Sequence, residues 1–237
     1  TPPYSSAASD VYKRQACNAA ILQGDGKQAG DEPQLSLIGS SVRQDGRSAS
    51  LTAPNGLAQQ ALLEAAFADA TISPEQLTCV EAHGTGTALG DPLEARSLAL
   101  SALATRDTSR ALALGGIKAN VGHAEAAAGL VGLLKVSLVL QQIMVPANAQ
   151  LQQLNPHVQA ALQATAAGLA SQLIPMEATS HMRVAGVSSF GYNGTVAHAV
   201  AQAPKPWMSP ILASAREHRR VHYRRRPYHW SPAARDK

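Results

Sequence analysis

Short apolar runs alternate with longer segments of helical periodicity between residues 35 and 202. Short apolar runs are typical of buried strands, and the sequence predicts strands over residues 35–42, 77–82, 112–117, 184–188 and 196–201. Apolar positions three and four residues apart predict helices over residues 55–71 and 126–142. Strands that alternate with helices indicate an α/β layered domain.

The clearest predicted helix start is the sequence Asp-Pro-Leu-Glu that begins at Asp91. Aspartate is a good N-terminal cap, proline fits the first helical turn, and a glutamate three residues after the cap can complete a capping box. The pattern therefore predicts that Asp91 and Glu94 cap a helix.

The longest apolar segment, residues 126–140, contains Lys135 and falls short of the ~18 residues that a membrane span needs. It is apolar nearly all round, which predicts a buried helix, and Gly129 and Gly132 would allow that helix to pack closely. No signal peptide is visible at the start, so we expect an intracellular, cytoplasmic protein that does not act at a membrane.

Composition supports a globular domain. The chain is 45% hydrophobic and only 15% charged, which excludes a disordered segment. Its two cysteines, Cys17 and Cys79, form neither a metal-ligand pattern nor a disulfide framework. A reducing compartment and the absence of a metal site are the expectations that follow.

The net charge of +4 arises in the tail, because residues 205–237 contain nine Lys/Arg and two acidic residues. The same tail interleaves arginines with Tyr223, Tyr228 and Trp230. This pattern is compatible with nucleic-acid binding, but a linker whose aromatic residues pack back on the body explains it better. We therefore expect a basic linker over residues 203–237 and no nucleic-acid partner.

The N-terminal residues 1–15 resemble the conceptual translation of a sequencing-library adapter, and we interpret them as a non-native segment. The alternative is an ordinary polar N-terminus. Residues 16–34 are polar and glycine-containing, and we interpret them as the remnant of an N-terminal half of the domain. Residues 35–202 are expected to form the folded domain.

Two histidines lie in unusual local sequences that each follow a predicted strand. One is the His-Gly-Thr-Gly-Thr stretch that begins at His83, and the other is Lys-Ala-Asn-Val-Gly-His, which ends at His123. Together with Gly-Val-Ser-Ser-Phe-Gly-Tyr, which ends at Tyr192, and the Gln-Asp-Gly-Arg turn at residues 44–47, these motifs resemble the C-terminal half of a β-ketoacyl synthase, most like those of type I modular polyketide synthases. The resemblance covers roughly residues 35–202, and it implies a thiolase-like fold, αβαβα in the complete enzyme.

The resemblance implies a decarboxylative condensation of an acyl thioester with a malonyl-type extender carried by an acyl carrier protein. His83 and His123 would donate hydrogen bonds to the enolate oxygen, so we expect the two side chains to approach each other and to line one cavity with Lys118. Lys118 resembles the lysine of the family's polar network, and Glu94 resembles its anionic partner. For either histidine, the alternative is an ordinary core residue.

Other site residues follow from the same resemblance. Thr85 and Thr87 correspond to hydroxyls that bind the phosphopantetheine arm, although simple turn chemistry is an alternative for both. Gly191 and Tyr192 occupy the family's gating and oxyanion loop. Here the sequence departs from the family, because Tyr192, Asn193 and Val196 replace the usual Phe, Gly and Asn.

The nucleophilic cysteine of the family has no counterpart in this sequence. Cys17 lies outside the family's motif, and Cys79 lies inside a predicted strand, where it would be buried and inert. We therefore expect an acyltransferase of the 3-oxoacyl-[acyl-carrier-protein] synthase type that is inactive as a fragment. The alternative is an inactive partner protein like a chain-length factor, although such relatives tend to lose the histidines.

The expected partners are an acyl carrier protein and a second copy in a homodimer. No cofactor is expected beyond the phosphopantetheine of the carrier protein. A dinucleotide-binding enzyme is excluded by spacing, because Gly84, Gly86 and Gly90 do not form G-x-G-x-x-G.

Overall fold

The computed structural model describes residues 13–18, 20, 35–46, 54–149, 151–176 and 183–203. The chain divides into two units, Thr1–Lys205 and Pro206–Lys237. Most of residues 1–34, and the whole predicted linker except Ala203, lie outside the described residues, so the expectations for these segments stay predictions.

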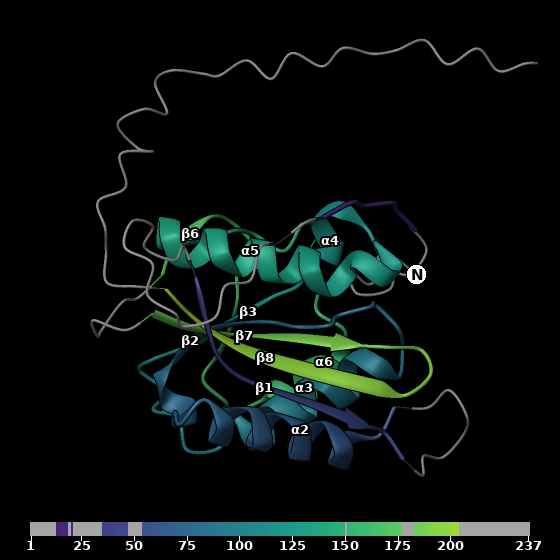
Figure 1. Cartoon of the computed structure of the whole chain (residues 1–237). Helices are drawn as coiled ribbons and strands as arrows, with labels where there is room; N and C mark the ends of the chain where they lie inside the picture. The colour runs from purple at the N-terminus through teal and green to yellow at the C-terminus, as the bar shows by residue number, and fades with distance from the viewer. Residues whose placement is uncertain are drawn as a thin grey trace, which may run out of the picture. The chain divides into compact units, whose positions relative to one another are not determined.

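A six-stranded sheet forms the centre of the first unit, with α2 below it and α5 above it in Figure 1. Its strands lie in the order β1 (Ser36–Gln44), β8 (Thr195–Ala203), β7 (Arg183–Phe190), β2 (Leu77–Glu81), β3 (Leu112–Gly115) and β5 (Ala167–Leu169). The strands β1, β8 and β7 are antiparallel, whereas β7, β2, β3 and β5 run parallel. All five predicted strands are present, and β3 is shorter than expected because the chain turns into a helix after Gly115.

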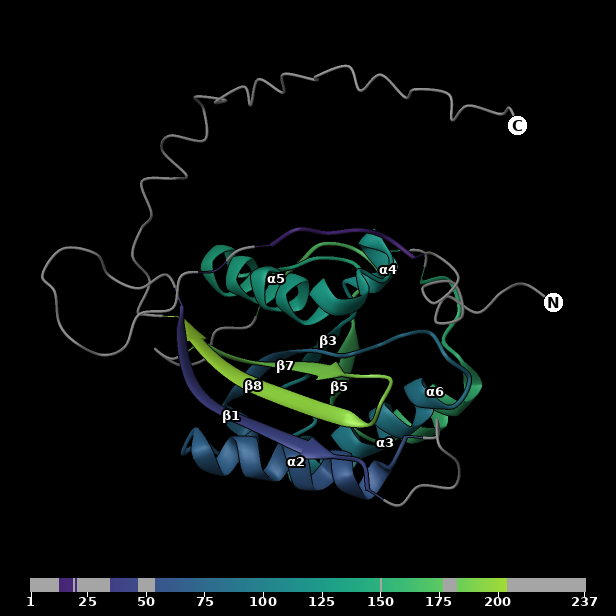
Figure 2. The ribbon, with the colours of Figure 1, turned by 45° about the vertical axis from the view of Figure 1, so that its right-hand side comes forward.

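Helices cover both faces of the sheet (Figure 2). One face carries α2 (Gly56–Asp69), α3 (Gly90–Ser101) and α6 (Pro156–Leu162), and the other carries α4 (Lys118–Val121) and α5 (Ala128–Gln142). Short 3-10 helices, η2 (Pro74–Gln76) and η3 (Glu125–Ala127), precede β2 and α5, and a second sheet pairs β4 (Met144–Val145) with β6 (Ile174–Pro175). The α/β layered prediction is confirmed, but α6 and the strands β4, β5 and β6 were not expected.

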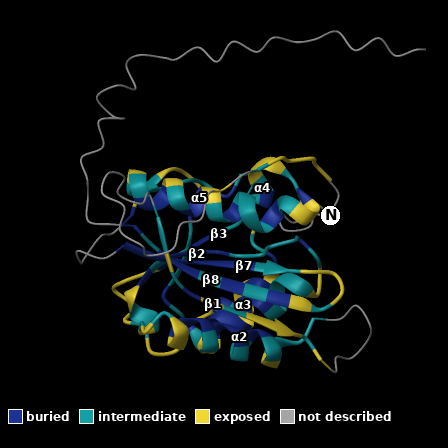
Figure 3. Ribbon diagram, viewed as in Figure 1, coloured by how far each residue is buried: buried dark blue, intermediate teal, exposed yellow. Residues whose placement is uncertain are grey.

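Two apolar cores lie on opposite faces of the sheet, where Figure 3 shows its buried strands. Leu63, Phe67 and Leu98 of α2 and α3 pack below it, whereas Val136 and Leu140 of α5 pack above it. Burial of this apolar area is the main force that holds the layers together.

The predicted helix over residues 126–142 is buried on one side only. Leu134 and Leu138 are exposed by 39% and 59%, so the expectation of a helix buried all round was wrong. The close packing expected at the glycines is present: a Cβ on Gly129 would lie 2.7 Å from Ser189 Oγ, and one on Gly132 would lie 3.2 Å from Glu81 Cγ. Among the described residues, no helix is long and apolar enough to span a bilayer.

His198, on β8, lies in the core and belongs to neither of the two predicted histidine motifs. It is 1% exposed, its Nδ1 lies 3.0 Å from Ser188 Oγ, and its ring packs edge-on against Phe67. A Cβ on Gly186 would lie 2.6 Å from its Nε2, so glycine provides the space for the ring. Burial lowers the pKa of His198 to about 4.

We expect acid to weaken the fold through His198. Its folded-state pKa lies below the unfolded value of ~6.5, so its contribution is complete above ~6.5 and is lost as the pH falls towards 4. Between about pH 7.5 and 5, wild type should lose about 2 kcal/mol of unfolding free energy relative to His198→Gln. Urea unfolding of both proteins at the two pH values measures this difference, and a pH-independent difference would contradict it.

Candidate functional site

The two motif histidines come together at the carboxyl ends of neighbouring parallel strands. His83 follows β2, and His123 follows β3 through the short helix α4. Their ring centroids lie 6.0 Å apart with the planes at 85°. The predicted approach of His83 and His123 is therefore present, although 40 residues separate them in sequence.

Backbone amides hold both imidazoles in the same tautomer. The N–H of Phe190 donates to His83 Nδ1 at 3.2 Å, and the N–H of Glu125 donates to His123 Nδ1 at 2.8 Å. In a neutral imidazole the proton then lies on the other nitrogen, Nε2. The pKa of His83 is lowered to about 3, mainly because the ring is buried and to a smaller extent because Lys118 and His123 are close. His83 is therefore a neutral Nε2–H donor at physiological pH.

The His83 peptide unit is held at both ends by buried charged side chains. Glu94 accepts from the N–H groups of His83 and Gly84 at 2.6 and 2.9 Å, and the Lys118 ammonium donates to the His83 carbonyl. Glu94 and Lys118 are 6% and 4% exposed. The expected network is present, but the two side chains meet through the His83 peptide rather than in the direct ion pair that we predicted.

The predicted capping of α3 by Asp91 is wrong, because the helix already begins at Gly90. Thr87 Oγ1 accepts from the Gly90 N–H at 3.1 Å, and Asp91 instead accepts from the Gly86 N–H at 2.9 Å. Burial and the neighbouring Glu94 raise the pKa of Asp91 to about 7. The acidic residues of α3 therefore shape the loop that follows His83 instead of capping their own helix.

The predicted pantetheine-binding threonines lie on that loop. The hydroxyls of Thr85 and Thr87 are 3.3 Å apart, and Thr87 also makes the turn hydrogen bond to Gly90. Gly84 and Gly86 have positive φ values of 46° and 79°, which glycine adopts at low cost. Thr87 therefore stabilises a turn, as the alternative interpretation predicted. A role in binding pantetheine stays a prediction for both threonines.

The predicted gating loop approaches His83 through Phe190 rather than through Tyr192. The Phe190 ring centroid lies 5.1 Å from that of His83, whereas Tyr192 is 83% exposed. The Gly191 N–H donates to the Thr195 carbonyl at 2.6 Å and closes a tight turn. Phe190 was missed as a site residue, although it belongs to the Ser-Ser-Phe-Gly stretch that carried the resemblance.

A buried ion pair that the sequence analysis did not predict joins β2 and α5. Lys135 Nζ lies 2.6 Å from Glu81 Oε2, with the side chains 8% and 3% exposed. Glu81 Oε1 accepts from the Ile117 N–H at 2.5 Å. The sequence offered a signal for each residue, because Glu81 lies in an apolar strand and Lys135 in an apolar helix. Neither signal indicates that the two residues pair with each other.

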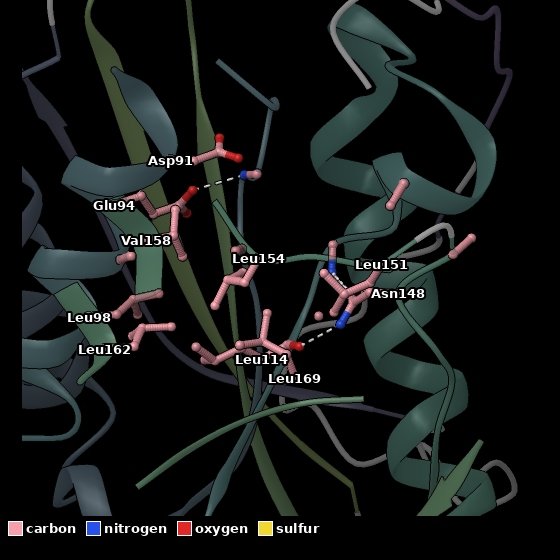
Figure 4. A pocket seen from close by; sticks show the side chains of 17 residues that line it. Asp91, Glu94, Leu98, Leu114, Asn148, Leu151, Leu154, Val158, Leu162 and Leu169 are labelled. Carbon is pink, nitrogen blue, oxygen red and sulfur yellow. Dashed lines mark hydrogen bonds between the residues drawn. The ribbon is translucent and has the colours of Figure 1, made fainter. Parts of the chain in front are cut away.

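A cavity of about 120 Å³ lies beside the histidine-bearing loop, between α3, α6 and the ends of β2, β3 and β5 (Figure 4). Its wall is mainly apolar, with six leucines, Val158 and several alanines and glycines, and Asp91 and Glu94 lie at one end. His83, His123 and Lys118 do not line this cavity, and the expectation that they line one cavity together stays a prediction. Glu94 lines this cavity and also binds the N–H groups of His83 and Gly84.

The two cysteines differ in their surroundings, and the expected lack of a nucleophile stays a prediction. Cys79 is buried in β2, and this burial is the main reason that the pKa of its thiol is raised to about 12. The thiol therefore stays protonated and unreactive. Cys17 is exposed. No group of three or more His, Cys, Asp or Glu side chains suited to a metal ion occurs in the part of the chain that the structure describes.

The start of the described chain lies against His123. The Arg14 N–H donates to the His123 carbonyl at 2.9 Å, and Lys13 Nζ lies 3.8 Å from Glu125 Oε1. Native and foreign residues could make this contact equally well, so the assignment of residues 1–15 as adapter-derived stays a prediction.

Comparisons with known proteins agree with the site. Residues 35–152 match the family described as "Beta-ketoacyl synthase, C-terminal domain". The chain is 39% identical over 224 residues to mycoketide-CoA synthase of Mycobacterium tuberculosis and 38% identical over 213 residues to polyketide synthase GfsE of Streptomyces halstedii. Each match covers 89% of this chain but only 5% and 6% of the relatives.

Solved structures give the same result. The ketosynthase from module 6 of the bacillaene synthase of Bacillus subtilis superposes with a TM-score of 0.67 at 33% identity, over 74% of this chain and 31% of that one. An oxazolomycin ketosynthase domain of Streptomyces albus gives 0.67 and 33%, over 73% and 31%. The chain therefore spans about a third of these two ketosynthases.

Proposed function

Because this chain belongs to the β-ketoacyl synthases and carries their C-terminal domain, we propose that it supplies the two-histidine half of a polyketide-synthase condensing site. The substrates would be an acyl thioester and a malonyl-type extender, the latter on the phosphopantetheine arm of an acyl carrier protein. The observation that carries the proposal is the pair of adjacent imidazoles that both present Nε2–H.

In the proposed reaction the malonyl thioester loses its carboxylate as CO₂, and the electron pair of the broken C–C bond forms an enolate. His83 and His123 donate hydrogen bonds to the enolate oxygen through Nε2. The enolate carbon then attacks the acyl thioester carbonyl, a C–C bond forms, and a cysteine thiolate leaves. Fixed donors of this kind are typically worth about 3–4 kcal/mol each in barrier height.

We assign supporting roles to the remaining site residues. Lys118 and Glu94 position His83 through its own peptide unit, and Thr85 and Thr87 offer hydroxyls to the pantetheine arm. Gly191 and Tyr192 belong to the loop that would gate the acyl chain and donate to the oxyanion. In a complete homodimeric synthase, the cysteine would come from residues other than Cys17 and Cys79.

A hybrid synthase tests the proposal. Residues 35–203 of this chain would replace the matching residues of the bacillaene module 6 ketosynthase, which supplies the remaining part of the domain. We expect this hybrid to release CO₂ from a malonyl-carrier protein and to form a β-ketoacyl product, measured by mass spectrometry of the carrier-bound chains. A folded hybrid without either product would refute the proposed function.

The isolated chain should be inactive in the same assay. Because Cys79 is a buried thiol of raised pKa and Cys17 lies outside the matched motifs, we expect no stable acyl-enzyme when the chain is incubated with a radiolabelled acyl thioester. Intact-mass analysis measures the adduct. A stoichiometric acyl group on Cys17 or Cys79 would contradict this prediction and would reopen the question of the nucleophile.

A further inference from the structure

We propose that the buried Glu81–Lys135 ion pair positions the segment that carries Lys118 and His123, an inference that rests on the proposed function. Among the described interactions, Glu81 binds both Lys135 and Ile117, and neither side chain of the pair hydrogen-bonds to the imidazole of His83 or His123. Any effect of the pair on the chemistry therefore passes through the backbone of that segment.

Glu81 joins the two strands that deliver the histidines. It is the last residue of β2, two residues before His83, and its Oε1 accepts from Ile117, which follows β3. The backbone adds a parallel link, because the Ala82 N–H donates to the Gly115 carbonyl at 2.8 Å. One carboxylate thus fixes the separation of the chain segments that lead to His83 and to His123.

Ile117 is the residue through which this restraint reaches the site. Its carbonyl accepts from the N–H groups of Asn120 and Val121 at 2.9 and 3.0 Å, so it begins α4. The next residue, Lys118, donates to the His83 carbonyl, and α4 ends just before His123. A shift of Ile117 would therefore move both the lysine and the second histidine relative to His83.

Lys135 restrains the same segment from its other end. It lies on α5, which begins a few residues after His123, and it reaches back to the second oxygen of Glu81. His123 consequently lies between two attachments to one carboxylate, one through Ile117 and one through α5. This arrangement suits a residue that must keep a fixed distance from a partner on another strand.

The surrounding backbone leaves space for the pair. A Cβ on Gly115 would lie 2.5 Å from Lys135 Nζ and 2.9 Å from Glu81 Oε2, and one on Gly132 would lie 3.2 Å from Glu81 Cγ. The pair is therefore closely enclosed by glycines on β3 and α5. A buried ion pair is weak support for stability by itself, which makes a positioning role the better explanation for retaining two buried charges.

Two charge-neutral double variants separate positioning from simple stability. Glu81→Gln with Lys135→Met removes both charges but keeps an oxygen that can accept from Ile117. Glu81→Leu with Lys135→Met also removes that acceptor. Neither variant leaves an unpaired buried charge, and Ser137→Ala, which removes a hydrogen bond of α5 elsewhere, is the matched control.

The first readout is the imidazole ¹⁵N spectrum of this chain, which reports the tautomers of His83 and His123 without requiring activity. The second is the kcat for CO₂ release by the hybrid, compared with its KM. We expect Ser137→Ala to resemble the parent. The Gln double variant keeps an acceptor for Ile117 but loses the attachment through Lys135, so it should show an effect between those of the parent and the Leu double variant. The Leu double variant should lose the single Nε2–H tautomer at His123 and lower kcat by about tenfold to a hundredfold with little change in KM.

Unchanged tautomers and kcat in a folded Leu double variant would overturn the proposal. If that variant does not fold, Glu81→Asp takes its place, because the shorter carboxylate cannot reach both Lys135 and Ile117; an unchanged His123 spectrum would again overturn it. If the parent hybrid is folded but inactive, the proposed function fails, and the spectra still decide whether the ion pair positions His123.

Discussion

Replacing His123 with alanine in the hybrid synthase should slow release of CO₂ from a malonyl-carrier protein by about 10²–10³-fold. The variant removes one of two fixed Nε2–H donors, and loss of one such donor costs roughly this factor in other enzymes that stabilise an oxyanion. Because the donor acts on charge that develops during the reaction, we expect kcat to fall much more than KM rises.

The matched control for that prediction is His157→Ala. His157 is an exposed histidine at the start of α6, and its loss should leave the rate unchanged. Radiolabelled CO₂ measures decarboxylation directly, and circular dichroism shows whether each variant is folded. Full CO₂ release by the folded His123→Ala hybrid would exclude His123 as a donor to the enolate.

Replacing Lys118 with methionine should destabilise the fold by about 3–5 kcal/mol, which is typical when one partner of a buried charge cluster is removed. Lys118 is 4% exposed, and its positive charge faces the buried carboxyl groups of Glu94 and Glu81 and the partly buried carboxyl group of Asp91. Without Lys118, Glu94 and Asp91 lose their neighbouring cation, Glu81 keeps its ion pair with Lys135, and the His83 carbonyl loses its donor.

Urea unfolding of the chain at pH 7 and pH 5 tests this second prediction. The destabilisation should be smaller at pH 5, because burial raises the pKa of Asp91 to about 7. At pH 5 its carboxyl group is therefore mostly neutral and no longer pairs with the charge of Lys118. Arg96→Met removes an exposed cation from α3 and should have little effect at either pH. Equal losses for the Lys118 and Arg96 variants would show that Lys118 is not part of a buried charge network.

The sequence predicted the parts of the fold that have a regular apolar pattern. The runs at β2, β3, β7 and β8 are continuous because helices bury both faces of these strands. Residues 143–176 contain strands of two or three residues, which are too short to produce a period, and their hydrogen bonds depend on partners far away. This is why β4–β6 could not be predicted, whereas α6 does carry a helix-start signal, Asn155 followed by Pro156, which was missed.

The candidate site divides in the same way. Motif resemblance identified His83 and His123, because their neighbours in sequence are distinctive. It did not predict that Glu94 would accept hydrogen bonds from the backbone at His83 instead of forming an ion pair with Lys118. The sequence pattern around Glu94 indicated helix capping, and nothing in it distinguishes that role from a tertiary contact. The Glu81–Lys135 pair joins residues 54 positions apart, and only the packing of α5 against β2 and β3 brings them together.

The backbone donors to the two imidazoles have a consequence for how the site can change during evolution. A carboxylate that orients a histidine can be protonated or replaced by a single substitution. The backbone amides of Phe190 and Glu125 do not titrate, and any residue except proline would supply them. The identity of the proton-bearing nitrogen is therefore encoded in loop conformation. Substitutions such as Tyr192 and Asn193 can be tolerated as long as they preserve the path of the main chain, and an insertion or deletion in either loop would disturb the histidines more than most side-chain replacements.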